Sequence, residues 1–417
     1  MKNVINTEIA VIGGGASGFA AAISALECGA DVVIAEKLDR VGKKLLATGN
    51  GRCNLSNSSI TAEHYHGSVS NIMKLVGNCR DTEDFFRGMG LLCVSDAEGR
   101  MYPRSNSASS VLDALRLKLN SLGGREICGF EVAKIIPSGG SFRLLSENGE
   151  IKCRRVIVAA GGYAAPAMGT DGSVIRMLRD MGYRTSKLCP AVAPLKVDPA
   201  EMKGLKGVRV KCAVTAIADG KALRREEGEL QFTDGALSGI CIFNMARFMS
   251  GFEGRLSIAA DLCPDMTERE LEEFLFTAQS ARRDCEAEDF LTGLLTKKLA
   301  VYIMKKAVGK PLSYKAADLK YPEIQAIARC IKRLEFKITG SAPWQSAQVT
   351  SGGIHGSCID GKLGSTLHRG IYFCGEILDI DGDCGGYNLQ WAWSSGRAAG
   401  KNCAQSLRTE DLNGTDK

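Results

Sequence analysis

The sequence has little of what metal and dithiol centres need. It contains 16 cysteines but no Cys-x-x-Cys pair, and its 4 histidines form no Cys/His cluster at metal-ligand spacing. We therefore expect no metal site, no iron–sulfur cluster and no dithiol redox centre. Most of the cysteines should be small buried side chains with free thiols.

Long apolar runs and a signal-peptide pattern are also missing. No stretch reaches the length of a membrane span, and the first residues lack the layout of a signal peptide. Of the 417 residues, 45% are hydrophobic and 24% are charged, which is the balance of a soluble globular protein with two or three domains. We expect a cytoplasmic protein without a membrane span.

Strong charge of one sign is absent as well. The formal net charge is +6, the basic residues are scattered, and aromatic residues make up only 6% of the chain. Basic and aromatic residues do not interleave as in an RNA-binding module. Solvated surface charge is the simpler interpretation, and a phosphate-bearing ligand or RNA stays open.

The hydrophobic pattern predicts an α/β fold. Residues 9–12 and 31–35 are predicted strands that flank a helix at 20–26, so the chain opens with a β-α-β unit. Another buried strand is predicted at 156–160, and α/β character returns near the C-terminus with a strand at 370–374 and a helix at 388–404. Beyond residue 190, short strands and then helices are predicted, at 267–276, 290–308 and 316–331.

This order of predicted strands and helices indicates a discontinuous first domain with an insertion. We expect a split Rossmann-like domain from residues 1–190 and 340–417, an antiparallel, barrel-like β insertion at 191–264, and a helical part at 265–339. Residues 43–57 are rich in glycine, asparagine and serine, and are predicted to be a long functional loop.

A Gly-x-Gly-x-x-Gly motif lies between the first predicted strand and helix. Gly13 permits a tight turn, Gly15 lets the backbone approach a pyrophosphate, and Gly18 allows close helix–strand packing. Glu36 follows at the end of the next strand, where its carboxylate can accept from ribose hydroxyls. In this context the motif predicts dinucleotide binding.

The motif alone does not distinguish NAD from FAD, but later segments do. The chain has no second Gly-x-Gly-x-x-Gly, while residues 156–162 and 372–376 resemble, in this order, two further segments of flavoproteins. Residues 385–388 precede a helix, whose free N–H groups and positive dipole end suit negative charge on a reduced flavin ring. Together these segments favour FAD.

Longer strings resemble a known family. Residues 42–54, with 350–353 and 375–396, are similar to the BaiN/RdsA-type (HI0933-like) NAD(P)/FAD-dependent flavoproteins, and the similarity covers essentially the whole chain. The resemblance implies an FAD domain built from both chain ends. It also implies that the Val132 backbone contacts the adenine and that five residues of the 43–57 segment line the cofactor, namely Lys44, Thr48, Gly51, Arg52 and Asn54. Independently, a glycine-rich loop with Lys44 and Arg52 can approach and neutralise a diphosphate.

The expected FAD-binding residues lie in the glycine-rich segments, in the loop and beside them. They are Gly13, Gly15, Ala16, Ser17, Gly18, Glu36, Lys37, Lys44, Thr48, Gly51, Arg52, Asn54, Val132, Ala160, Gly161, Gly162, Gly375, Glu376, Gly386, Tyr387, Asn388 and Leu389. No catalytic acid is assigned, although His355 and Tyr387 could each supply a proton. Cys53 lies beside Arg52, which could activate its thiol, but packing is the simpler role.

The resemblance implies an oxidoreductase that reduces a carbon–carbon double bond conjugated to a carbonyl. One substrate class is a small steroid-like enone, a 3-oxo-Δ4 or 3-oxo-Δ4,6 bile-acid intermediate. The other is uridine in ribosomal RNA, reduced to dihydrouridine. NADH or NADPH would bind transiently as the reductant, since a second dinucleotide fingerprint is missing. A non-enzymatic flavin redox sensor is a third hypothesis.

Overall fold

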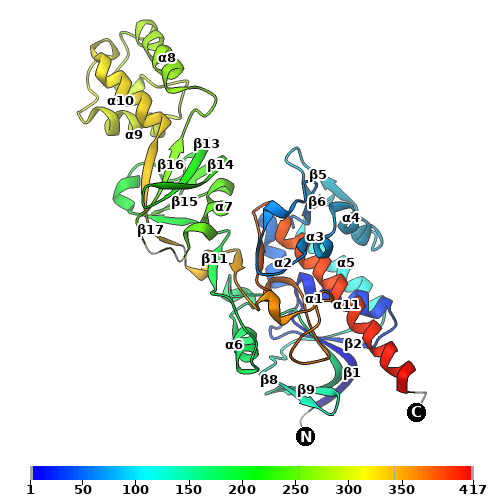
Figure 1. Cartoon of the computed structure of the whole chain (residues 1–417). Helices are drawn as coiled ribbons and strands as arrows, with labels where there is room; N and C mark the ends of the chain where they lie inside the picture. The colour runs from blue at the N-terminus through cyan, green and yellow to red at the C-terminus, as the bar shows by residue number, and fades with distance from the viewer. Residues whose placement is uncertain (1–2, 251, 253, 342, 415–417) are drawn as a thin grey trace. The chain divides into compact units, whose positions relative to one another are not determined.

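The computed structural model describes residues 3–250, 252, 254–341 and 343–414 and divides into two compact units. We call them the nucleotide unit, Met1–Cys189 with Trp344–Lys417, and the inserted unit, Pro190–Pro343. The nucleotide unit therefore combines the blue, cyan and red parts of the chain in Figure 1. The predicted α/β class with an antiparallel β-barrel insertion is confirmed.

A seven-stranded sheet forms the centre of the nucleotide unit. The strands are β7 (Arg125–Ile127), β2 (Val32–Ala35), β1 (Asn3–Ile12), β10 (Gly149–Val158), β9 (Ser141–Ser146) and β8 (Lys134–Ser138), in this spatial order, with β19 (Ile371–Phe373) paired to β10. β1 is parallel to β2 and β10, and β10 is parallel to β19. The carboxyl ends of these strands therefore meet at one edge, where open α/β sheets bind their ligands.

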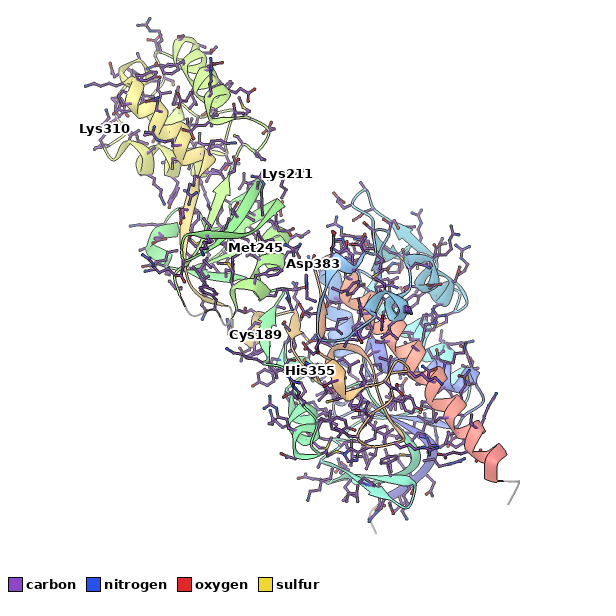
Figure 2. The ribbon with its side chains drawn as sticks, in the orientation of Figure 1. Cys189, Lys211, Met245, Lys310, His355 and Asp383 are labelled. Carbon is purple, nitrogen blue, oxygen red and sulfur yellow. The ribbon has the colours of Figure 1, made fainter. Side chains whose placement is uncertain are left out.

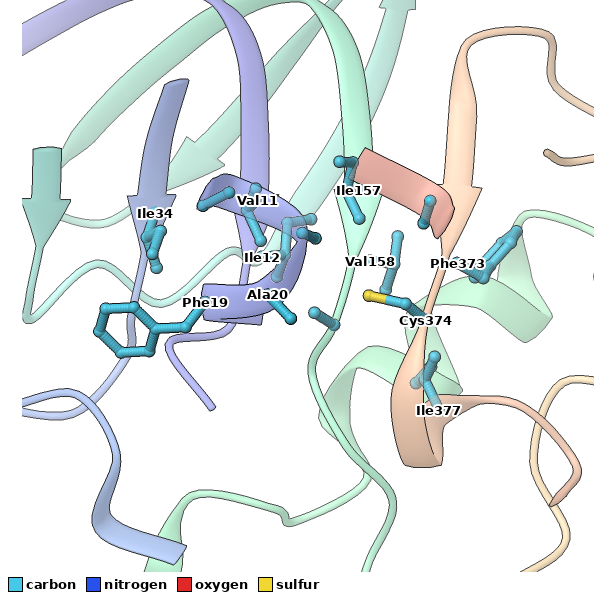
Figure 3. Close-up of a cluster of buried hydrophobic side chains, with 14 of the residues drawn as sticks. Val11, Ile12, Phe19, Ala20, Ile34, Ile157, Val158, Phe373, Cys374 and Ile377 are labelled. Carbon is cyan, nitrogen blue, oxygen red and sulfur yellow. The ribbon is translucent and has the colours of Figure 1, made fainter. Parts of the chain in front are cut away.

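Continuous apolar runs explain why these strands are central. All four residues of β2 are buried, as are the last four of β10, which fits strands covered on both faces. Figure 3 shows side chains of β1, β2, β10 and β19 packed with Phe19 and Ala20 of α1 (Ala16–Glu27). This cluster holds the strand ends together from segments more than 300 residues apart in the sequence.

Two glycines bring the first and last helices into close contact. A Cβ atom at Gly396 would lie 2.4 Å from the backbone oxygen of Ser17, and one at Gly400 would lie 2.1 Å from that of Ala21. Both glycines belong to α11 (Tyr387–Gly414), drawn in red in Figure 1. No larger residue fits this approach, so α11 lies directly against α1 beside the glycine motif.

Smaller elements complete the nucleotide unit. Its remaining helices are α2 (Lys43–Ala47), α3 (Ile72–Val76), α4 (Cys79–Arg87), α5 (Ala108–Ser121) and α6 (Ser173–Asp180), and its remaining strands are β3 (Ser56–Asn57), β4 (Tyr65–Gly67), β5 (Cys93–Ser95), β6 (Arg100–Pro103), β18 (Val349–Ser351) and β20 (Ile380–Gly382). β11 (Cys189–Ala191) crosses the division between the units. α2 corrects the prediction that residues 43–57 are a loop throughout.

The inserted unit contains a closed barrel of six strands. Its spatial order is β12 (Leu195–Val197), β15 (Ala236–Ser238), β14 (Lys221–Phe232), β13 (Arg209–Ala218), β16 (Leu256–Asp261) and β17 (Leu334–Ser341). The sequence prediction missed β14 because charged residues occupy its middle, so it lacks an apolar run. It also missed the helix α7 (Ile240–Met249).

The last barrel strand corrects two predicted boundaries. β17 pairs with both β12 and β16 and so closes the barrel, although the prediction placed residues 334–339 in the helical part. For the same reason the chain returns to the nucleotide unit at Trp344 rather than at residue 340. β17 joins the barrel by pairing with strands that are distant in the sequence. Local hydrophobic periodicity does not indicate such long-range pairing.

The helical part consists of α8 (Glu268–Ala281), α9 (Lys297–Val308) and α10 (Tyr321–Lys332). α10 begins five residues later than residue 316, where the helix was predicted to start, and Pro322 lies in its first turn. α9 likewise begins at Lys297 rather than at residue 290. Within the described ranges, no helix has both the length and the apolar character needed to cross a membrane.

Candidate functional site

The three glycines of the Gly-x-Gly-x-x-Gly motif have different surroundings. A Cβ atom at Gly13, whose φ is +107°, would lie 2.6 Å from the backbone oxygen of Ala159, and one at Gly18 would lie 1.9 Å from that of Gly13. At Gly15, by contrast, no described atom apart from those of its chain neighbours lies within 4 Å of such a Cβ. Gly13 and Gly18 therefore serve the fold, whereas Gly15 leaves an open space at the start of α1.

This open space faces the positive end of a helix. Gly15 is the N-cap of α1, and Ala16 and Ser17 belong to its first turn, which contains no acidic side chain. First-turn N–H groups have no partner within the helix, and together with the dipole they attract an anion. The place between β1 and α1 is thus suited to a pyrophosphate.

Glu36 is fixed by two backbone groups at the end of β2. Its Oε2 accepts from the N–H of Gly14 at 2.8 Å, and its Oε1 accepts from that of Leu38 at 2.9 Å. The side chain is buried, at 9% exposure. A carboxylate has about four acceptor positions, so Glu36 retains the capacity to accept from ribose hydroxyls.

Lys37 and Val132 lie near Glu36. The backbone N–H of Phe130 donates to the backbone oxygen of Glu36 at 2.9 Å, which brings the segment that contains Val132 beside the end of β2. Val132 is buried. Lys37 pairs with Asp171 at 2.8 Å, and this contact contributes to lowering the pKa of the Asp171 carboxyl to about 2 in spite of the opposing effect of burial.

A second group of predicted residues meets where β10 ends. Gly162 is so close to Thr350 that a Cβ would lie 2.3 Å from the Thr350 hydroxyl oxygen and 3.0 Å from Oε1 of Glu376. Glu376 in turn accepts from the Thr350 N–H at 2.9 Å and pairs with Lys44 at 2.8 Å. The Lys44 charge, which was expected to neutralise a diphosphate, is therefore balanced by a carboxylate of the protein itself.

The neighbouring residues of the β10 turn have similarly tight surroundings. Gly161 has a φ of +71°, and a Cβ there would lie 2.6 Å from the Thr170 side chain. The Cα of Ala160 lies 3.1 Å from the Cβ position built at Gly13. The turn after β10 and the turn after β1 thus lie side by side, as their predicted roles require.

The residues of the loop after α2 are held in place by local contacts. The Thr48 hydroxyl donates to the Leu45 backbone oxygen at 2.7 Å, and the Arg52 Nε donates to that of Gly49 at 3.2 Å. The Arg52 guanidinium also lies over the Tyr102 ring, 4.6 Å from its centroid. Beside them, Gly51 has a φ of +82°, and no described atom apart from those of its chain neighbours would lie within 4 Å of a Cβ there. This loop leaves free space at Gly51.

Asn54 joins the loop to the start of α11. In the amide orientation that satisfies both ends, its Nδ2 donates to the Ser56 backbone oxygen at 3.0 Å and its Oδ1 accepts from the Gly386 N–H at 3.1 Å. The Gly386 N–H is therefore already hydrogen-bonded to Asn54, which corrects the expectation that this N–H is free to bind a flavin. The N–H groups of Tyr387, Asn388 and Leu389 lie in the first turn of α11 and have no intrahelical partner.

Gly375 and Asn388 hold the other strand ends in place. A Cβ at Gly375 would lie 2.3 Å from the Ser17 hydroxyl, so the turn after β19 packs directly on α1. The Gly375 N–H donates to the Ser395 hydroxyl at 2.9 Å. The Asn388 amide bonds the Gly382 N–H and carbonyl at 2.8 and 2.7 Å, which fixes β20 to α11.

These observations fit a dinucleotide cofactor. The structure brings together the ends of β1, β2, β10 and β19, the loop after α2 and the first turn of α11 in one unit. Gly15 and Gly51 leave space that a Cβ would fill, and the first turn of α1 offers N–H groups to a diphosphate. No group of three His, Cys, Asp or Glu side chains arranged to hold a metal ion is found among the residues described.

Cys53 has the properties of a packed thiol. The side chain is fully buried, and burial raises its pKa to about 12. We expect Cys53 to remain unmodified when the folded protein is treated with iodoacetamide near neutral pH, whereas the exposed Cys128 reacts first. Mass spectrometry of the alkylated peptides measures this order, and rapid labelling of Cys53 would support a redox role instead.

The sequence analysis missed a polar cluster beside α11. His64, His66 and Asp383 were not singled out because their spacing matches no motif, yet hydrogen bonds connect all three. His355, which was considered as a proton source, instead accepts from the Ser357 N–H at 3.1 Å and so caps a short 3-10 turn. Figure 2 labels both His355 and Asp383.

Comparison with known proteins extends these observations. The family model of the HI0933-like protein Rossmann domain matches residues 7–402. The 3-dehydro-bile acid Δ(4,6)-reductase of Clostridium scindens is 35% identical over 408 residues, which cover 95% of this chain and 99% of the relative. The ribosomal RNA dihydrouridine synthase of Haemophilus influenzae is 25% identical over 96% of this chain and 98% of its own length.

Solved structures show the same fold at low identity. The 3-ketosteroid Δ1-dehydrogenase of Sterolibacterium denitrificans has a TM-score of 0.50 and 13% identity, over 96% of this chain and all of that chain. A quinol–fumarate reductase has a TM-score of 0.51 and 14% identity, over 98% of this chain and 72% of that chain. Because the family model spans most of the sequence and a relative is 35% identical along nearly its whole length, the chain belongs to the HI0933-like family and is an FAD-dependent oxidoreductase.

Proposed function

We propose that the protein uses FAD to reduce a carbon–carbon double bond conjugated to a carbonyl in a steroid-like substrate, a 3-oxo-Δ4 or 3-oxo-Δ4,6 bile-acid intermediate. The observation that carries this proposal is the 35% identity to a 3-dehydro-bile acid Δ(4,6)-reductase over 99% of that relative. The residues expected to bind FAD meet in one unit, which supports the cofactor part of the proposal.

Each segment of the site has a separate task in this proposal. The first turn of α1 holds the pyrophosphate next to Gly15, while Glu36 accepts from ribose hydroxyls. Tyr387, Asn388 and Leu389 direct first-turn N–H groups of α11 toward negative charge on the ring system. When bound, FAD supplies hydride transfer, and the protein supplies position and electrostatic stabilisation.

The electron donor belongs to the proposal too. We expect NADH or NADPH to reduce the enzyme by binding transiently, because the sequence contains only one Gly-x-Gly-x-x-Gly motif. Absence of bleaching of the FAD spectrum by either nucleotide, in a sample that dithionite bleaches, would contradict this part of the proposal.

Reduction of uridine in ribosomal RNA is the second candidate. Dihydrouridine synthases of Haemophilus influenzae and Escherichia coli are each 25% identical over nearly the whole chain. Their reaction also adds hydrogen across a double bond conjugated to a carbonyl, so the same site chemistry would serve it. The lower identity places this candidate second.

Reoxidation of the reduced enzyme distinguishes the candidates. We expect anaerobically reduced protein to regain the oxidised flavin band rapidly after a 3-oxo-Δ4 bile acid is added, with the saturated 3-oxo compound as product. Unmodified ribosomal RNA added instead should leave the band bleached. Reoxidation by RNA alone, with a steep dependence on salt, would establish the second candidate. If neither the bile acid nor the RNA reoxidises the flavin, the remaining hypothesis is the non-enzymatic flavin redox sensor.

A further inference from the structure

A hydrogen-bonded chain of three side chains lies at the start of α11. The Tyr387 hydroxyl is 3.1 Å from Nε2 of His64, and Nδ1 of His64 is 3.2 Å from Oδ2 of Asp383. The rings of His64 and Tyr387 are also stacked, with centroids 4.1 Å apart and an interplanar angle of 20°. Tyrosine, imidazole and carboxylate thus stand in the order of a catalytic triad.

The backbone fixes Asp383 and His64 relative to each other. β4 pairs with β20, and the Asp383 N–H donates to the His64 backbone oxygen at 2.9 Å. Asp383, labelled in Figure 2, follows β20 and its side chain is 3% exposed. His66 contacts the other carboxylate oxygen of Asp383 at 3.0 Å. The buried carboxylate is therefore held between two imidazoles.

The carboxylate decides which nitrogen of His64 carries a proton. Because Oδ2 of Asp383 only accepts, Nδ1 of His64 must donate to it, and Nε2 is left to exchange a proton with Tyr387. The Tyr387 oxygen can accept from Nε2 and donate its own hydrogen elsewhere at the same time, which neither nitrogen of His64 can do. Tyr387 is consequently the end of the chain that can serve a substrate.

We propose that Tyr387, His64 and Asp383 form a proton relay in which the Tyr387 hydroxyl supplies the proton that completes reduction of the double bond. This inference rests on the proposed function. Tyr387 is also one of the residues expected at the cofactor, and the proposed substrate would bind beside the cofactor to receive hydride.

The proton balance of the relay closes. Hydride adds to the carbon β to the carbonyl, and the electrons of the double bond form an enolate. The enolate α-carbon takes the hydroxyl proton of Tyr387. The phenolate then takes a proton that water delivers through Nε2 of His64. His64 ends neutral, and its Nδ1–H still donates to Asp383. Water can reach the imidazole because the His64 side chain is 29% exposed.

The acidity of Tyr387 agrees with a donor that is neutral before the reaction. Burial and the nearby Asp383 carboxylate raise its pKa to about 12, so the phenol keeps its proton at physiological pH. A phenolate formed in this place recovers a proton readily, which favours transfer from the imidazole.

Histidine NMR of the protein without FAD tests the pairing independently of any reaction. The chain has only 4 histidines, so ring signals from a 15N-histidine sample can be assigned by substitution. We expect the proton of neutral His64 on Nδ1 in the wild-type protein and a changed tautomer balance in Asp383→Asn. Wild-type His64 with its proton on Nε2, or ring signals that Tyr387→Phe leaves unchanged, would overturn the relay.

Reoxidation kinetics test the transfer itself. Tyr387→Phe should slow substrate-dependent reoxidation by about 100-fold or more without loss of bound FAD, as expected when a general acid is removed. Tyr183→Phe is the matched control, since Tyr183 is also buried with a pKa raised to about 12, but its hydroxyl bonds Ser365. His64→Ala should be equally slow and should recover part of the rate with added imidazole.

The two proposals fail in different ways. A Tyr387→Phe enzyme as fast as the wild type, or a His64→Ala enzyme that imidazole does not accelerate, overturns the relay while the reductase function stands. If neither a 3-oxo-Δ4 bile acid nor ribosomal RNA reoxidises wild-type flavin, the proposed function fails. The relay is then decided by the histidine signals alone.

Discussion

Gly15→Ala should leave the fold intact and remove most of the bound FAD. Gly15 has a φ of −91°, which alanine adopts freely, and no described atom apart from those of its chain neighbours lies within 4 Å of the added Cβ. That Cβ would occupy the space through which the backbone approaches the pyrophosphate. We expect FAD to bind at least about 100-fold more weakly, a loss of about 2.7 kcal/mol, in a titration of the apoprotein.

Gly18→Ala is the matched control within the same motif. Its Cβ would lie 1.9 Å from the Gly13 backbone oxygen, so α1 would have to move away from β1. We expect a loss of unfolding free energy of about 2–3 kcal/mol in the protein without FAD, as for other overpacked positions. Equal FAD affinity of Gly15→Ala and the wild type would show that the cofactor does not approach this turn.

Replacing Gln390 by leucine should strongly destabilise the nucleotide unit. The Gln390 Oε1 accepts from the hydroxyls of Ser56 at 2.6 Å and Thr82 at 2.7 Å, and its Nε2 donates to the Val76 backbone oxygen at 2.8 Å. The side chain is fully buried. Leucine would leave several buried polar groups unpaired, at a total cost of about 3 kcal/mol or more.

Thermal unfolding measures this cost. A loss of that size should lower the Tm by roughly 6–12 °C in a unit of this length. Gln405→Leu changes an exposed glutamine of the same helix and should shift the Tm by only a small amount. A similar Tm for both variants would mean that water or a rearranged side chain satisfies the groups that Gln390 now pairs.

Local patterns were enough to identify the parts of the site that are continuous in sequence. The motif from Gly13 to Gly18, with a buried strand before it and a helix after it, follows from short-range turn and packing requirements. Residues 42–54 and 375–396 were long enough to indicate the family, which the family model then confirmed. The predicted FAD contacts of individual residues remain predictions.

Local sequence patterns did not predict strands that are rich in charged residues, or contacts between residues that are distant in the sequence. β14 is a long strand, but the charged residues in its middle look like a polar turn. β17 belongs to the barrel through its pairing with β12, which lies more than 130 residues earlier in the chain. The Gly386 N–H was expected to be free because nothing in the neighbouring sequence shows that Asn54 accepts from it.

The sequence by itself determined the β-α-β start and the order of the glycine-rich segments. It also determined the family and the flavin chemistry. Each of these depends on residues that are neighbours along the chain. Only the tertiary structure decided that Lys44 is balanced by Glu376 and that His64 meets Asp383 and Tyr387. His64 and Asp383 are 319 positions apart. Their contact arises from the pairing of β4 with β20, and hydrogen bonds between such distant strands leave no periodic signal in the sequence.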